Sequence, residues 1–186
     1  MDPATVTSIA VIGRLADQAN QGDHGSSDVR APSASTPLDG ITAAFPGARV
    51  VLVTDDDPAA AAEAARTADV AVVVAGFTAE DEGEYVGSDT MGNPDLLALY
   101  PPRPDGVRAT GEEVVMTAGE GFGGDRTSLR LRSVDEEVIR EVAAANPRTV
   151  VAVVAAGPVL TEAWRQQVPA VLLLSLIHIS EPTRPY

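Results

Sequence analysis

The chain has 186 residues, 45% of them hydrophobic, which fits one domain or a piece of a larger protein with a real core. Its formal net charge of -14 argues against binding to nucleic acid or to anionic membranes, because both need basic patches. The absence of cysteine excludes disulfides and thiolate chemistry, and no apolar run reaches the roughly 18 residues of a membrane span. We therefore expect a soluble protein whose export stays open.

The first half of the chain predicts three strands, with a helix after each of the first two. Ile9–Ile12 forms the first strand. The first helix begins with Thr36 as its N-cap and Pro37 in its first turn, and ends at Pro46 and Gly47. The elements that follow are a strand at Val50–Val53, a helix at Pro58–Thr67 and a strand at Val70–Ala75.

The second half predicts two more strands and two helices. The longer helix begins at Ser133, whose hydroxyl is expected to cap the first turn while Glu136 reaches back. Valines then recur along one face of this helix at a four-residue spacing. The remaining elements are a strand at Thr149–Val154, a short helix at Leu160–Gln167 and a strand at Ala170–Leu174.

The order of these elements predicts the fold class. The strands are continuously apolar rather than alternating, which is typical of parallel strands buried on both faces by helices. We therefore predict an α/β fold with a mostly parallel sheet flanked by helices. Two long segments, Gln18–Ser35 and Phe77–Arg132, show no convincing helix and follow strand ends. Doubly wound sheets bind ligands at the carboxyl ends of their strands, so these segments are expected to carry the function.

A series of short motifs extends along the same elements. They are Ile9–Asp17, Gly22–Ser27, Thr36–Ile41, Ala68–Gly76, Asp81–Tyr85, Gly124–Leu129, Asn146–Val150 and Gly157–Leu160. In order and spacing, this series resembles the C-terminal α/β domain of glycoside hydrolase family 3, the β-glucosidase and β-xylosidase-like enzymes. The final residues, Ser175–Tyr186, depart from that pattern and resemble a translated sequencing adapter. We expect residues 1–174 to be an incomplete domain of this family and residues 175–186 to be a non-native tail.

The resemblance implies a retaining glycoside hydrolase that acts on O-glycosyl bonds of a β-linked sugar and uses no cofactor. In the family the nucleophilic Asp lies on a preceding barrel domain, while this domain lends loops and often the acid/base Glu. The barrel is missing here, and retention needs two carboxyl groups about 5 Å apart. We therefore expect the barrel as a partner and no activity from this chain alone.

Three glutamates are candidates for the acid/base residue. Glu82 lies in Asp81–Tyr85, where the resemblance places that carboxyl, and Glu84 in the same motif is an alternative. Glu120 is a rival because its Gly-Glu-Gly-Phe setting also resembles a family motif. A solvated acidic loop is the alternative interpretation of Asp81–Tyr85.

Two further groups are candidates for contacts with the substrate. One is the small and polar loop that the family brings close to its active-site cleft, with Asp23, Gly25, Ser26 and Ser27, which otherwise is an ordinary turn. The other is Asp125 with Arg126, which is more often a pair that fixes a loop. No metal site is expected, because the chain has two histidines and no cysteine.

Two other functional classes compete with a hydrolase. One is a non-catalytic carbohydrate-binding or structural domain. The other is a nucleotide-binding domain, because Gly119, Gly121 and Gly124 form the pattern G-x-G-x-x-G. That pattern normally opens into a helix whose N-terminus holds pyrophosphate, whereas here Glu120 and Asp125 add negative charge and an extended segment follows. The nucleotide-binding class is therefore disfavoured.

Overall fold

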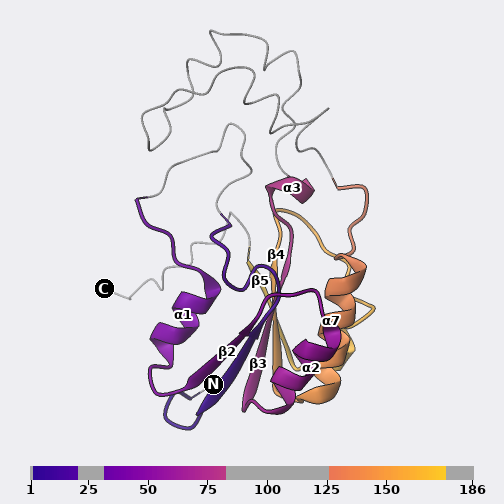
Figure 1. The fold of residues 1–186 in the computed structure, drawn as a ribbon. Coiled ribbons are helices and arrows are strands. Elements are labelled where there is room, and N and C mark those ends of the chain that lie inside the picture. The colour runs from indigo at the N-terminus through magenta and orange to yellow at the C-terminus, as the bar shows by residue number, and fades with distance from the viewer. Residues whose placement is uncertain (1, 21–31, 83–125, 175–186) are drawn as a thin grey trace, which may run out of the picture. The chain divides into compact units, whose positions relative to one another are not determined.

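The computed structural model describes residues 2–20, 32–82 and 126–174 (Figure 1). These residues belong to two compact units. The larger unit holds the sheet and comprises the described residues up to Phe77 and from Ser128 onward, and the smaller holds residues 78–82 and 126–127.

The larger unit is built on a five-stranded parallel sheet with the order β2-β1-β3-β4-β5. All five predicted strands are present, and the predicted fold class is confirmed. Their bounds are β1 (Ser8–Ile12), β2 (Arg49–Val53), β3 (Val70–Gly76), β4 (Thr149–Val154) and β5 (Ala170–Leu174).

The strand order reverses beside β1. The chain adds β2 on one side of β1 and then places β3 on the other, so that Ile9 lies opposite both Val50 and Val70. In sheets of this kind the carboxyl ends of the strands at such a reversal form a natural crevice. A ligand-binding site is therefore expected among the residues that follow β1 and β3.

Helices cover both faces of the sheet, as Figure 1 shows. Helices α2 (Pro58–Arg66) and α7 (Ser133–Ala145) pack together on one face, where Ala65, Ile139 and Val142 are buried against the strands. Helix α1 (Pro37–Ala44) lies on the other face and contributes Leu38 and Ile41. The buried side chains of β1, β3 and β4 lie between these two layers.

The first two helices begin as local sequence rules require. Thr36 caps α1 by accepting a hydrogen bond from the backbone of Asp39, whose carboxylate accepts one from the Thr36 backbone in return. Asp57 caps α2 by accepting from two backbone N–H groups of its first turn. The predicted N-terminus of α1 is therefore confirmed.

Two of the helix predictions are wrong in detail. Ser133 does not cap α7, because it is the first helical residue. Arg132 holds the N-cap position and makes no side-chain capping hydrogen bond to the helix backbone, and Glu136 accepts from Arg130. The helix predicted at Leu160–Gln167 is replaced by a turn and a single 3₁₀ turn, η1 (Arg165–Gln167). The reason is a non-local contact: Leu160 pairs with Arg130 in an isolated parallel β-bridge, in which the Leu160 backbone N–H donates to the carbonyl of Leu129.

Burial also differs from the prediction at the two edges of the described sheet. Strands β2 and β5 are only partly covered, and Leu52, Leu172, Leu173 and Leu174 are exposed. A continuous apolar run therefore indicates burial on both faces only for the inner strands, which have a neighbour on each side. Within the segment predicted to lack helix, the structure has a short helix, α3 (Ala79–Glu82). No helix among the described residues is long and apolar enough to cross a membrane.

Candidate functional site at the carboxyl ends of the strands

The strand ends at the reversal of strand order approach one another backbone to backbone. Gly13 follows β1 with a φ of +112°, and an added Cβ would lie 2.2 Å from the carbonyl oxygen of Val74. Gly76 ends β3 with a φ of +142°, and an added Cβ would lie 2.0 Å from the carbonyl oxygen of Val154. Only glycine fits at these two positions, because any side chain would collide with the backbone of the neighbouring strand. The backbones at the carboxyl ends of these strands therefore lie in close contact.

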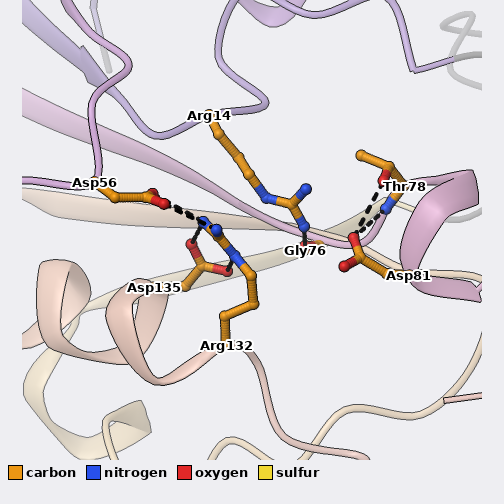
Figure 2. A network of polar contacts seen from close by, with 7 residues as sticks. All are labelled: Arg14, Asp56, Gly76, Thr78, Asp81, Arg132 and Asp135. Atoms are coloured by element: carbon orange, nitrogen blue, oxygen red, sulfur yellow. Dashed lines mark hydrogen bonds and ion pairs between the residues drawn. The ribbon is translucent and has the colours of Figure 1, made fainter.

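A second feature of this edge is a set of arginines that hold its loops. Figure 2 shows Arg132 between Asp56, in the loop after β2, and Asp135, in the first turn of α7. Its guanidinium donates two hydrogen bonds of 2.9 Å to Asp56 and two of 2.6 and 3.1 Å to Asp135. Arg14 donates at 2.8 Å to the carbonyl of Gly76. One guanidinium thus ties the loop after β2 to the start of α7.

The charges of this set neutralise one another. The hydrogen bond from Arg132 is the main cause that lowers the pKa of Asp56, and the positive charges of Arg132 and Arg14 add to it against desolvation. The hydrogen bond to Asp135 is the largest cause that raises the pKa of Arg132. Asp135 is buried and lies in the first turn of α7, where the helix dipole favours a negative charge. The arrangement stabilises the fold and favours the ionised form of Asp56.

Arg130 forms a second anchor for the same helix. It donates to buried Glu136 at 2.5 Å, and its other contact, with Glu162, is longer at 3.6 Å. The hydrogen bond to Glu136 is the largest cause that raises the pKa of Arg130. Arg130 and Arg132 together fix the chain where it enters α7.

The smaller unit places two of the predicted site residues together. Glu82, the last residue of α3, lies 2.5 Å from the Arg126 guanidinium, with 14% and 9% of the two side chains exposed. Thr78 begins this helical turn by donating through its backbone and its hydroxyl to the Asp81 carboxylate (Figure 2). The alternative interpretation, a solvated acidic loop, does not describe Glu82 itself, because its side chain is only 14% exposed.

The other predicted residues are not described by the structure. Asp23, Gly25, Ser26, Ser27, Glu84, Glu120 and Asp125 lie outside the described residues, as does the G-x-G-x-x-G pattern. Within the described part of the chain, no group of three or more His, Asp or Glu side chains is placed to hold a metal ion.

Sequence reasoning did not find the Arg132 anchor. Arg132 lies just before a predicted helix and three residues before Asp135, and this spacing was a usable signal. The contact with Asp56 was not, because 76 residues separate the two. The predicted pairing of Asp125 with Arg126 stays a prediction, because Asp125 lies outside the described residues, and the contact of Arg126 with Glu82 was not predicted.

The fold and the ordered strand ends define a parallel α/β domain with a long insertion after its central strand. The family model described as "Glycosyl hydrolase family 3 C-terminal domain" matches residues 1–177. The chain therefore belongs to this family.

Known proteins similar to this chain agree with the assignment. A "Beta-glucosidase" from Schizophyllum commune is 34% identical over 136 residues, which cover 72% of this chain and 54% of that protein. A "Probable beta-glucosidase L" from Aspergillus terreus is 31% identical over 140 residues, which cover 74% of this chain and 14% of that protein. The chain thus spans about half or less of the length of these relatives.

Solved structures show the same fold. The β-glucosidase D2-BGL from Chaetomella raphigera matches with a TM-score of 0.62 and 22% identity, over 92% of this chain and 22% of its own. The β-D-glucoside glucohydrolase from Trichoderma reesei matches with a TM-score of 0.61 and 24% identity, over 89% of this chain and 22% of its own.

Proposed function

We propose that this chain is part of a retaining, β-glucosidase-like glycoside hydrolase that acts on O-glycosyl bonds. In this proposal it contributes active-site loops and the acid/base carboxylate, while a barrel domain supplies the nucleophilic Asp. The observation that carries the proposal is the family match over residues 1–177, on a sheet with long insertions at its carboxyl edge. That edge is where parallel α/β sheets bind ligands.

The chemistry divides between two carboxyl groups. One attacks the anomeric carbon, and the other protonates the leaving oxygen and then activates water, across a gap of about 5 Å. Glu82, Glu84 and Glu120 are the candidates for the second role, all in the segment between β3 and α7. Because the first role belongs to the barrel, this chain alone is expected to show no turnover of aryl β-glycosides.

Two alternatives receive less support. A carbohydrate-binding domain usually presents an aromatic side chain to the sugar, but Trp164, the single tryptophan, is fully buried in the core. A nucleotide-binding domain is disfavoured by the acidic charge of the chain and by the acidic residues within its glycine pattern.

The test uses the full-length enzyme with each candidate glutamate changed to Gln. At the acid/base position the change should slow glycosides with poor leaving groups by about 10²- to 10⁴-fold, while activated aryl glycosides react nearly normally. Azide should then accelerate the second step and yield a glycosyl azide, because a small anion needs no general base.

Glu137→Gln is the matched control, since Glu137 is exposed on α7. It should leave all substrates unaffected. If none of the three glutamate variants shows leaving-group dependence and azide product, the acid/base carboxylate does not come from this segment and the proposal fails.

A further inference from the structure

We propose that Arg14 and Asn20, in the loop after β1, are positioning residues that hold the end of β3 for the proposed reaction. Arg14 donates to the carbonyl of Gly76 at 2.8 Å, and the side-chain amide of Asn20 donates to the carbonyl of Phe77 at 2.9 Å. Two side chains from one loop thus bind two consecutive carbonyls at the end of the neighbouring strand. The inference rests on the proposed function, because the three candidate glutamates follow Phe77 in the chain.

The two side chains supply the donors that a longer β1 would supply. β1 pairs with β3 only as far as Ile12 opposite Val73, whereas β3 pairs with β4 as far as Gly76 opposite Val154. β3 therefore continues past the end of β1, and no strand among the described residues pairs with it on that side beyond this point. Gly76 and Phe77 are both buried, and buried backbone carbonyls are nearly always paired. Side chains from the loop meet this need.

The loop that carries the two donors is itself anchored to α1. The hydroxyl of Thr36 donates to the Asp17 carboxylate at 3.1 Å, and the backbone N–H of Leu38 donates to the carbonyl of Ala16 at 2.9 Å. The donors therefore project from a backbone that is already fixed. A contact made from a fixed backbone loses less conformational entropy when it forms, so two hydrogen bonds suffice to hold the strand end.

The end of β3 matters because of what the chain carries next. Phe77 is bonded directly to Thr78, where the turn that leads into α3 and Glu82 begins. Motion of the Phe77 peptide is passed on to the residues bonded to it. A general acid must lie within hydrogen-bond reach of the leaving oxygen, and a displacement of about 1 Å can cost about 10²-fold in rate. Loss of a donor should therefore misplace the proton donor while leaving its proton in place.

Hydrogen exchange on this chain tests the contact without any enzymatic assay. Asn20→Asp removes the donor with almost no change in shape, because the amide becomes a carboxylate. Gln18→Glu is the matched control, since it makes the same chemical change on an exposed side chain of the same loop. The readout is the exchange rate of the Phe77 amide by NMR, compared with that of the Ala155 amide. Both amides donate to a carbonyl of a neighbouring strand.

Asn20→Asp should speed exchange at Phe77 about tenfold and leave Ala155 unchanged, because only the local opening becomes easier. Gln18→Glu should behave like the wild type at both amides. Arg14→Met should also speed exchange at Phe77, and Arg14→Lys, which keeps a cationic donor, should restore slower exchange. The contact is overturned if Asn20→Asp and Arg14→Met leave Phe77 unchanged, or if Ala155 accelerates as much as Phe77.

The full-length enzyme tests the positioning role. Asn20→Asp should slow glycosides with poor leaving groups about tenfold more than activated aryl glycosides, because only the former need the proton. The fall of kcat/KM at high pH should remain, since the acid is still present, whereas Gln at the acid/base position should abolish it. A loss of stability alone reduces the amount of active enzyme and slows both substrates by the same factor. Equal slowing of both, or no slowing, overturns the positioning role.

The glutamate variants separate this failure from that of the proposed function. If one of them gives leaving-group dependence and azide product while Asn20→Asp does not distinguish the substrates, only the positioning role is overturned. If none of them does, the proposed function fails and the positioning role fails with it.

Discussion

The strongest prediction about stability concerns Arg132, and the variant Arg132→Met keeps the apolar stem while removing the guanidinium. Arg132 makes two ion pairs, one exposed and one buried. The exposed one, with Asp56, whose side chain is 45% exposed, stabilises the fold by about 0.2–1 kcal/mol. Leaving Asp135 buried without a partner costs about 3–5 kcal/mol, and toward the lower end here because Arg132 itself is 29% exposed. We therefore expect a loss of about 3 kcal/mol in the free energy of unfolding.

Urea denaturation followed by circular dichroism measures this loss at neutral pH. Asp56→Asn removes only the exposed half and should cost less than about 1 kcal/mol. Replacing both Arg132 and Asp135 by apolar residues, as in Arg132→Met/Asp135→Leu, should recover most of the loss. The reasoning is refuted if Arg132→Met costs less than about 1 kcal/mol, or if Asp56→Asn costs as much.

The pH dependence of this variant follows from the lowered pKa of Asp56. A carboxyl whose pKa is lower in the folded state stabilises the fold above the ordinary carboxyl pKa of about 3.9, and this stabilisation is lost as the pH falls through the lowered value. The difference between wild type and Arg132→Met should therefore shrink as the pH falls below the ordinary carboxyl pKa of about 3.9.

Two further predictions test other parts of the larger unit. Gly76→Ala should destabilise the fold by more than about 3 kcal/mol in urea, because its Cβ would lie 2.0 Å from the Val154 carbonyl oxygen. Gly40→Ala, inside α1 with nothing within 4 Å of the added Cβ, should instead stabilise it by about 0.5–1 kcal/mol. The hydroxyl and backbone of Thr7 lower the pKa of Asp69 to about 2, so its stabilising contribution is complete above about pH 4 and is lost toward pH 2. NMR titration of Asp69 should show this pKa. In the Asp69→Asn variant, the free energy of unfolding should depend less on pH between about pH 4 and pH 2.

The sequence was sufficient to predict the elements whose signals are local. Each strand is a run of β-branched and apolar residues, and the start of α1 is a reciprocal pair, Thr36 and Asp39, three positions apart. Burial along β2 and β5 was not predictable in the same way, because it depends on which strands lie at an edge of the sheet. The helix predicted from Leu160 failed for a related reason, because the backbone of Leu160 pairs with a segment far away in the sequence, at Leu129.

The contacts of the candidate site also differ in whether they join residues that are close in the sequence. The spacing of Arg132 and Asp135 was visible in the sequence, but the pairing of Arg126 with Glu82 required the fold. Long, charged side chains have many acidic neighbours to choose from in a chain of this composition, so sequence alone does not select the partner. The proton donor itself stays a prediction among Glu82, Glu84 and Glu120, because the last two lie outside the described residues and the contact of Glu82 does not test its role.

The position of the long segment has a consequence for how such domains diversify. Residues 77–132 stand between β3 and α7, yet β3 and β4 pair in regular register from Ala71–Thr149 to Gly76–Val154. The crossover through α7 therefore keeps its geometry whatever is inserted before it. Each doubling of such an insertion adds only about 0.6 kcal/mol of closure entropy. The length and sequence of this segment can therefore change at little cost, while the strands and helices of the sheet keep their sequence.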